Sequence, residues 1–197
     1  MTFVIRSVQP AEDFVLDVAG RKPAGEGRAA TWFDTLFQEH YPRIVGMLAR
    51  LIGDRGHSEE IAADVFCKVA GRQTLPQPAE LTAWVYRVAT NAGLDALRSN
   101  ARRRRREQQA EAESVRAASP EGALDDLLRQ ERCARVRAVL ALLKPREAQL
   151  LLLRANGLAY RELAQTLGIH PGSVGTLLAR AEAEFERKFR ARYGGEA

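Results

Sequence analysis

A row of polar side chains at helical spacing is the part of the sequence best suited to chemistry. Arg87, Asn91, Asp95 and Arg98 are three or four residues apart, so an α-helix would bring them onto one face. Such a row is either a solvated face or a surface that bonds to bases and phosphates. The arginine run that follows, Arg102–Arg106, contains no acid and is either a phosphate-binding tract or the solvated start of a linker. The candidate nucleic-acid-binding residues of this segment are Arg87, Asn91, Asp95, Arg98, Arg102 and Arg103.

A second candidate, at residues 160–181, has the spacing of a helix-turn-helix. Leu163 would point the first helix inward, Ala164 permits a close helix crossing, and Gly168 suits the positive φ of a tight turn. In this motif the second helix enters the major groove with its N-terminus first. An ordinary helical hairpin without DNA contact is the alternative. The side chains expected to face DNA are His170, Pro171, Gly172, Ser173, Thr176 and Arg180.

Helical periodicity predicts the elements that position these residues. Apolar residues repeat at helical spacing from Thr31 to Gly53, where Pro42 is predicted to begin a second helix. Ser58, followed by two acids, is predicted to begin the next helix. A proline-containing loop then precedes the helix that carries the polar row, and no strand-like alternation occurs in the sequence.

Composition divides the chain into domains. Residues 1–30 contain glycine and proline without sustained periodicity and are predicted to be a poorly ordered extension. Residues 31–107 form a first predicted domain and residues 129–197 a second, which contains the helix-turn-helix. Residues 108–128 are predicted to be the linker between them. The predicted fold class is all-α, with two small helical domains joined by a flexible linker.

Charge and cysteine content restrict the partners and the compartment. Thirty Lys and Arg against 25 Asp and Glu give a formal net charge of +5, which favours polyanionic partners. Cys67 and Cys133 lie in apolar stretches without CxxC spacing, which predicts buried thiols and no disulfide. Neither a signal-peptide pattern nor a run of about 18 apolar residues occurs, so we expect a cytoplasmic protein without membrane insertion. The histidine spacing predicts no metal site, and no cofactor is expected.

Three stretches of the sequence resemble bacterial RNA polymerase sigma factors of the extracytoplasmic-function (ECF) group. The first, residues 33–66, is similar to the opening helices of that family. The second, Ala83–Arg98, is similar to its promoter-melting and minus-ten-reading helix. The third, Ala141–Glu147 leading into the helix-turn-helix, resembles the domain that reads the minus-thirty-five element.

The resemblance implies a role for each segment. The helix near residues 59–69 would dock on the polymerase clamp, and Asn91 and Asp95 would face the minus-ten region. The loop at residues 72–80 resembles in position the family loop that captures a flipped base. The implied partners are core RNA polymerase, promoter DNA and an anti-sigma factor. The implied polymerase contacts are Glu60, Asp64, Val65 and Lys68.

The sequence departs from the family pattern in the second domain. Gly175 and Leu177 stand where the family usually has Lys and Arg, and Glu182 stands where it often has Arg. Ala159 replaces the usual Ser or Thr before the first motif helix, which removes a side-chain cap typically contributing about 1 kcal/mol. These departures predict weaker binding of the helix-turn-helix to the minus-thirty-five element.

The sequence is compatible with two classes of function and disfavours a third. The leading hypothesis is a promoter-specificity subunit that catalyses nothing itself. The alternative is a helix-turn-helix regulator that binds DNA as a dimer without polymerase. An enzyme is disfavoured, because the sequence has no glycine-rich phosphate loop, no nucleophile elbow and no paired catalytic carboxylates.

Overall fold

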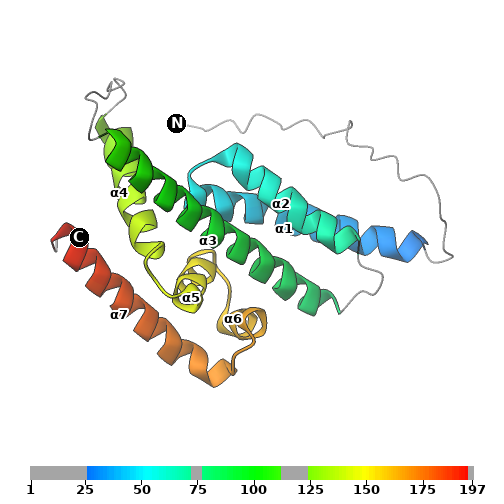
Figure 1. The fold of residues 1–197 in the computed structure, drawn as a ribbon. Helices are drawn as coiled ribbons and strands as arrows, with labels where there is room; N and C mark the ends of the chain where they lie inside the picture. Colours follow the sequence, from blue (N-terminus) through cyan, green and yellow to red (C-terminus); the bar gives the residue numbers. More distant parts are fainter. Residues whose placement is uncertain (1–25, 72–76, 112–123, 195–197) are drawn as a thin grey trace, which may run out of the picture.

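The computed structural model describes residues 26–71, 77–111 and 124–194, and this part of the chain consists of helices joined by short loops and turns (Figure 1). Most of the predicted extension, a loop segment at 72–76 and a linker segment at 112–123 lie outside the described residues. No strand occurs within the described ranges, which confirms the predicted all-α class. The elements are α1 (Glu26–Ile52), α2 (Arg55–Ala70), α3 (Pro78–Glu111), α4 (Leu124–Leu140), α5 (Pro145–Ala155), α6 (Tyr160–Leu167), the short 3₁₀ helix η1 (Pro171–Ser173) and α7 (Val174–Tyr193).

Helices α1, α2 and α3 pack together as the first half of the molecule. Their apolar faces meet in a core where Met47, Val65, Val85 and Leu94 are almost fully buried. The part of the α3 surface that remains exposed carries polar residues. None of the described helices is both long and apolar enough to cross a membrane.

Two predicted helix boundaries in this half are wrong. Helix α1 continues through Pro42, which is exposed, because His40 and Ile44 on either side are buried and tertiary packing outweighs the break. Helix α2 begins before Ser58, and its cap is Asp54, whose carboxylate accepts a hydrogen bond from the His57 amide at 3.1 Å. The buried Ser58 hydroxyl instead donates to the Asp54 carbonyl oxygen within the first turn.

The second half consists of α4 to α7 and packs directly against the first. Helix α7 contacts α4 and α5, while α5 and α6 lie against α3. Figure 1 shows α3 between the α1–α2 pair and the α5–α7 group. Buried side chains of both halves, such as Val85 and Leu153, therefore belong to one continuous hydrophobic core.

His40 is a buried polar residue between α1 and α3. Its Nδ1 lies 3.4 Å from the Tyr86 hydroxyl oxygen, and the two rings meet edge to face with centroids 5.7 Å apart. Burial lowers the pKa of His40 below its ordinary value of 6.5, and Arg43 acts in the same direction. Glu39 and Glu162 oppose this shift of the pKa, since both carboxylates favour the charged ring.

Acidification should therefore destabilise the fold through His40. The unfolded chain takes up a proton on this ring near pH 6.5, whereas the folded chain does so only at lower pH, so stability falls as the pH drops through that window. Urea unfolding at about pH 7.5 and about pH 5.5 measures the loss. The variant His40→Gln should lose less stability over the same interval, and an unchanged pH dependence in that variant would contradict this role.

Gly93 in α3 allows a close approach to α1. A Cβ atom at this position would lie 2.5 Å from Leu48 Cδ2 and 3.0 Å from Leu51 Cδ2, and both leucines are buried. At Gly46 in α1, a Cβ atom would meet Arg50 Nη1 at 3.6 Å, which is an ordinary contact.

Alanine at these two glycines should change stability in opposite directions. Gly46→Ala should raise the free energy of unfolding by about 0.5–1 kcal/mol, because alanine loses less backbone entropy in a helix. Gly93→Ala should lower it by about 1–2 kcal/mol, because overpacking of the leucines outweighs that gain. Urea unfolding followed by circular dichroism measures both changes. An equal gain in the two variants would contradict the tight crossing.

Candidate nucleic-acid interface

Helix α3 brings the predicted polar row onto one face. Arg87, Asn91 and Asp95 are exposed, and Arg98 is half-buried at the end of the row. The Arg98 guanidinium lies 3.7 Å from the Asp95 carboxylate and also donates to the Leu143 carbonyl oxygen at 3.4 Å. The row thus combines amide, carboxylate and guanidinium groups, which are the groups that bond to base edges and phosphates.

Contacts from the second half reach into this row. The side-chain oxygen of Asn91 accepts a hydrogen bond from the side-chain amide of Gln149 in α5. Together with the bond from Arg98 to the backbone after α4, this contact connects two members of the row to the other half of the molecule. The sequence carried no signal for it, because the partners are 58 positions apart.

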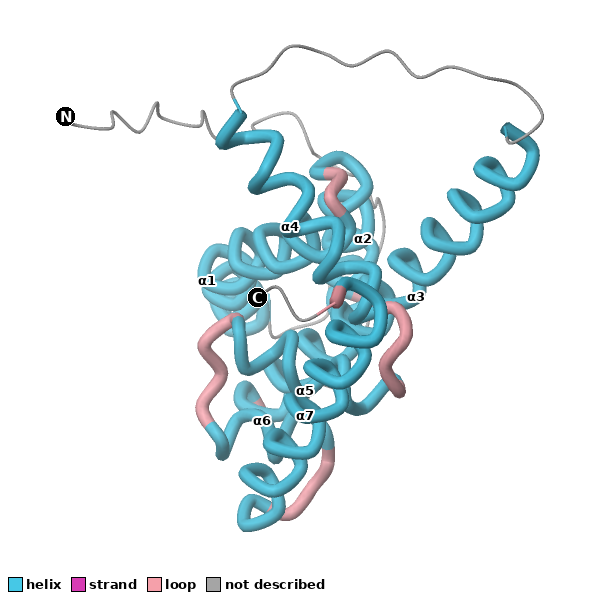
Figure 2. The backbone as a smooth tube through the Cα atoms, turned by 90° about the vertical axis from the view of Figure 1, so that its left-hand side faces the viewer, coloured by secondary structure: helices cyan, strands magenta, loops and turns pink. Residues whose placement is uncertain are grey.

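The arginine run extends the same helix. Helix α3 continues through Arg102–Arg106 to Glu111, taking in the first residues of the predicted linker, and these arginines are exposed. Arg103 lies 3.6 Å from the Glu107 carboxylate, which offsets part of its charge. The C-terminal end of α3 projects away from the other helices (Figure 2), so its positive charge faces solvent.

The predicted helix-turn-helix is formed by α6, η1 and the start of α7. Gly168 ends α6 with φ of 61°, the left-handed conformation that the turn requires. Ala159 provides no side-chain cap, but the Glu162 carboxylate accepts a hydrogen bond from its backbone amide at 2.6 Å. His170 Nδ1 accepts a bond from the Gly172 amide at 3.2 Å, so this imidazole shapes the turn as well as facing solvent. All of the side chains expected to face DNA here are exposed: His170, Pro171, Gly172, Ser173, Thr176 and Arg180.

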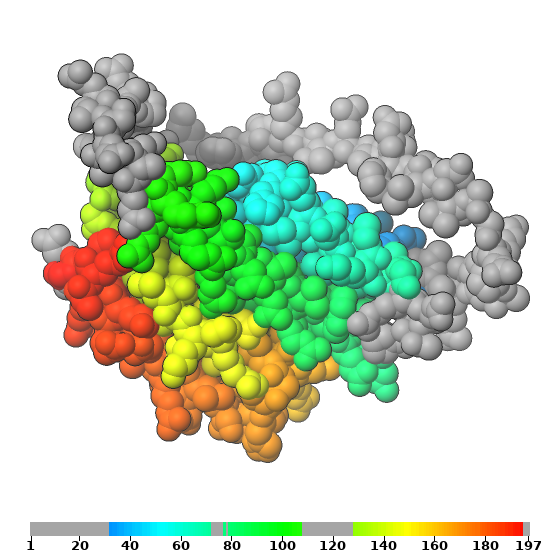
Figure 3. All heavy atoms as spheres, in the orientation of Figure 1, coloured from blue at the N-terminus to red at the C-terminus, as the bar shows by residue number. Residues whose placement is uncertain are grey.

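The positions that depart from the family pattern have different surroundings. A Cβ atom on Gly175 would lie 3.8 Å from the Tyr160 ring, so there is room for a side chain. Leu177 is half-buried and packs against the core, and Glu182 is exposed. In the space-filling view the segment around residues 160–180, in orange, forms the lower edge of the molecule, below α3 (Figure 3).

Helix α2 presents part of the predicted polymerase-binding set to solvent. Glu60, Asp64 and Lys68 are exposed at successive turns. Val65, the fourth predicted contact, is only 1% exposed and belongs to the core. Its neighbour Asp64 faces solvent. Successive residues of an α-helix point about 100° apart, so the side chain of the next residue, Val65, points towards the core.

The prediction that the two thiols are buried is wrong. Cys67 and Cys133 are both free and exposed. The apolar stripe of α2 is made by Ala62, Val65, Phe66 and Val69, and Cys67 falls just outside it.

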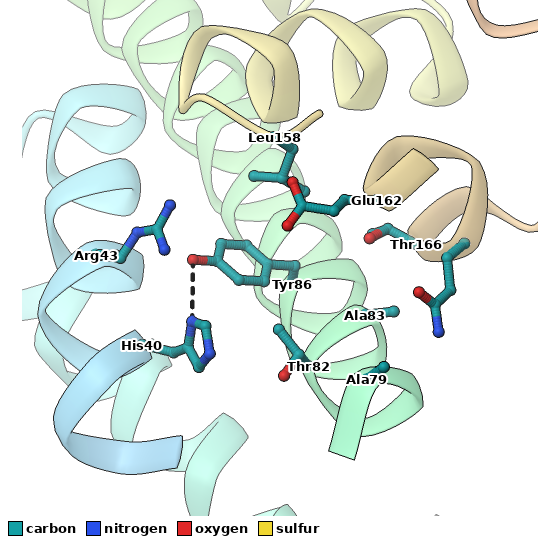
Figure 4. A pocket seen from close by; sticks show the side chains of 10 residues that line it. His40, Arg43, Ala79, Thr82, Ala83, Tyr86, Leu158, Glu162 and Thr166 are labelled. Carbon is teal, nitrogen blue, oxygen red and sulfur yellow. Dashed lines mark hydrogen bonds between the residues drawn. The ribbon is translucent and has the colours of Figure 1, made fainter. Parts of the chain in front are cut away.

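A cavity of about 270 Å³ lies between α1, α3 and α6, where the two halves meet (Figure 4). His40 and Arg43 line it from α1, Tyr86 from α3, and Glu162 and Thr166 from α6. No pattern in the sequence links these residues, because they come from three separate helices. The cavity shows that polar side chains, as well as apolar ones, lie at the junction of the halves.

Family models match both halves of the chain. The model for sigma-70 region 2 matches residues 36–103, and the model for sigma-70 region 4 matches residues 133–185. Region 2 therefore includes α2 and the polar row of α3, and region 4 includes the helix-turn-helix. The two matches together cover more than half of the chain.

Individual relatives are also sigma factors. The ECF RNA polymerase sigma factor SigE of Mycolicibacterium smegmatis is 27% identical over 192 residues, which is 96% of this chain and 72% of that protein. The RNA polymerase sigma factor CarQ of Myxococcus xanthus is 29% identical over 145 residues, 72% of this chain and 80% of that protein. A solved structure of the sigma factor RpoE in complex with the anti-sigma factor NepR from Bartonella quintana also matches, with a TM-score of 0.48 and 20% identity. The match covers 80% of this chain and 96% of the chain in that structure.

These matches separate the two functional hypotheses. A helix-turn-helix regulator working without polymerase is not favoured, because the region 2 match lies outside the helix-turn-helix and accounts for the first half of the chain. The two regions occur in the order and at the positions where the polar row and the helix-turn-helix were found. The chain belongs to the sigma-70 family and is an alternative sigma factor of the ECF group, which binds core RNA polymerase, recognises promoter DNA and initiates transcription.

Proposed function

We propose that the functions of this sigma factor are divided among three surfaces. The exposed face of α2 docks on core polymerase, the polar row of α3 reads and opens the minus-ten region, and the helix-turn-helix holds the minus-thirty-five element. The corresponding domains are residues 31–107 and 129–197, joined through residues 108–128. The protein works in the cytoplasm without catalysing a reaction, and its ECF membership supports an anti-sigma factor as a further partner.

The observation that carries this proposal is the continuity of α3. One helix holds the polar row and, beyond it, the exposed run Arg102–Arg106. Phosphate contacts position a protein on the duplex and base contacts give specificity, so a single rigid element supplies both. Arg87, Asn91, Asp95 and Arg98 are the base-facing residues in this proposal, and Arg102 and Arg103 bind phosphates.

Strand opening follows from binding energy alone. Extruding a base costs a few kcal/mol of lost stacking, which contacts to the extruded base must offset. Helix α3 begins at Pro78, about two and a half turns before the start of the polar row at Arg87. A base captured beside this end would therefore be held against a helix that is already anchored in the core by Val85 and Leu94.

The polymerase contact is proposed on α2. Glu60, Asp64 and Lys68 are exposed there and provide both negative and positive charge. Val65 instead packs in the hydrophobic core and holds α2 in place. Helix α2 packs on α1 and α3, so its remaining surface is available to a partner. The most direct experiment is promoter-dependent transcription with purified core polymerase, followed by footprinting of both promoter elements.

Removing the Asp95 carboxylate should impair open-complex formation. Losing one base-facing contact costs about 1–3 kcal/mol, so Asp95→Ala should form open complexes about 5- to 150-fold less well. Permanganate reactivity of unpaired thymines measures the opening, and gel filtration measures binding to core polymerase, which should be unchanged. The control is Asp34→Ala, which removes an exposed carboxylate from α1. Equal opening by the Asp95 and Asp34 variants would count against the reading role of α3.

A lysine at position 175 in place of Gly175 should raise the affinity for the minus-thirty-five element. The site has room for the side chain and lies at the start of α7, beside Thr176. One new phosphate contact should steepen the dependence of log K on log salt by about 0.9 on duplex DNA. Fluorescence anisotropy over a salt series measures this slope for Gly175→Lys. The control Ala191→Lys adds the same charge near the far end of α7, and the same slope in both variants would contradict a local contact.

A further inference from the structure

We propose that a hollow between α1, α3 and the end of α5 binds the phosphate group of a small phosphate monoester, and that the adjoining cavity holds the hydroxyl-bearing remainder of the same molecule. This phosphate hollow has a volume of about 200 Å³ and is lined by Pro42, Arg43, Gly46, Arg50, Tyr86 and Asn156. None of these residues belongs to the polar row of α3, to the DNA-facing set of the helix-turn-helix or to the exposed face of α2. The ligand site is therefore separate from the three surfaces of the proposed function.

The basic side of the phosphate hollow comes from one face of α1. Arg43 and Arg50 are seven residues apart, which is close to two turns, so both side chains leave the same face of the helix. Gly46 lies between them and has no side chain, which leaves the floor of the hollow open. A Cβ atom at this position would lie 3.6 Å from Arg50 Nη1. Two guanidinium groups beside an open floor can bind a phosphate through several charge-assisted hydrogen bonds.

The charge of these two arginines is not neutralised by the protein. None of the ion pairs formed in the described parts of the chain includes Arg43 or Arg50. Glu39 lies one turn before Arg43, but its carboxylate is 3.8 Å from His40 Nε2 instead. Arg50 donates a hydrogen bond to the side-chain oxygen of Asn156, which is a neutral group. The six residues that line the hollow include no acid, so both guanidinium groups are available to an anion.

Tyr86 adds a neutral donor to the phosphate hollow. Burial raises the pKa of Tyr86 above its ordinary value of 10.0, although Arg43 acts in the opposite direction, so the phenol keeps its proton near neutral pH. Its oxygen lies 3.4 Å from His40 Nδ1. When that nitrogen carries the ring proton, it donates to the Tyr86 oxygen and leaves the phenolic proton for a phosphate oxygen. Figure 4 shows Arg43 reaching from α1 towards this hydroxyl group.

The adjoining cavity suits a hydroxyl-bearing group better than a second anionic group. Arg43 and Tyr86 line both this cavity of about 270 Å³ and the phosphate hollow. Its other polar groups include the Glu162 carboxylate, the Gln165 amide and the Thr166 hydroxyl. The carboxylate repels a second anion but accepts hydrogen bonds from sugar hydroxyls. Together the two spaces reach the size of about 300–1,000 Å³ that is typical of small-molecule sites, which suits a sugar phosphate or a nucleoside monophosphate.

Both halves of the chain contribute to the ligand site. Arg43, Arg50 and Tyr86 lie within the region 2 match, whereas Asn156 and Glu162 lie within the region 4 match. A ligand that binds the folded chain but not the unfolded chain raises the stability of the fold as its concentration increases. Thermal unfolding of the full chain therefore reports binding independently of calorimetry.

Isothermal titration calorimetry of the full chain tests the proposal with defined probes. These are ribose 5-phosphate, adenosine monophosphate, inorganic phosphate, and ribose and adenosine as unphosphorylated controls. At least one ester should bind at a single site, about tenfold or more tightly than inorganic phosphate, because only an ester also fills the adjoining cavity. The preferred ester identifies the source of the phosphate group. Failure of both esters to bind, or equal affinity for inorganic phosphate, would overturn the proposal.

Three variants and a matched control locate the binding. Arg43→Gln and Arg50→Gln should each weaken ester binding about tenfold or more, because each removes a charge-assisted contact. Gly46→Leu should also weaken binding while keeping both charges, because its side chain fills the floor of the hollow. The control Arg132→Gln removes an exposed arginine from α4 and should leave the affinity unchanged. Circular dichroism verifies that each variant is folded.

The exposed arginine tract of α3 is a second place where a phosphate could bind. The double variant Arg104→Gln, Arg105→Gln removes two charges from this tract and should leave ester affinity unchanged. Loss of ester binding in that variant, or full binding by Arg43→Gln and Arg50→Gln, would overturn the proposal. Neither result bears on promoter-dependent transcription, which tests the proposed function separately.

Discussion

The division of the α3 surface is the constraint on which the rest of the structure depends. Val85 and Leu94 are nine residues apart and so lie on opposite sides of the helix, yet both are buried, because α3 packs against α1 and α2 and also against α5 and α6. The remaining face carries polar and basic residues. Any gain in burial against the second half therefore reduces the exposed polar surface of α3.

Most of the fold could be predicted from the sequence, because the signals for helices and turns depend on residues that are close together in the chain. Helical periodicity and the turn glycine Gly168 act over a few residues, and both correspond to observed elements. Helix α1 does not break at Pro42, because distant packing on both sides of the proline exceeds the local preference. Likewise, Cys67 lies in an apolar stretch but outside the buried stripe, which depends on the exact rotation of the helix.

The site divides in the same way. The polar row and the helix-turn-helix follow from spacing within one or two helices, and the structure brings their members onto common faces. The contacts that join the halves, such as Asn91 with Gln149 and His40 with Tyr86, connect residues 58 and 46 positions apart. No local pattern encodes such a pairing, since either partner alone is an ordinary polar residue.

The unbroken course of α3 has a consequence for orientation. A helix from Pro78 to Glu111 is roughly 50 Å long at about 1.5 Å per residue. In a continuous helix the angular position of each side chain about the helix axis is fixed. The directions in which Arg102–Arg106 point are therefore fixed relative to the direction of the polar row. In the proposed function, phosphates bound by the tract would therefore also set the rotation about the helix axis at which Asn91 and Asp95 meet the bases.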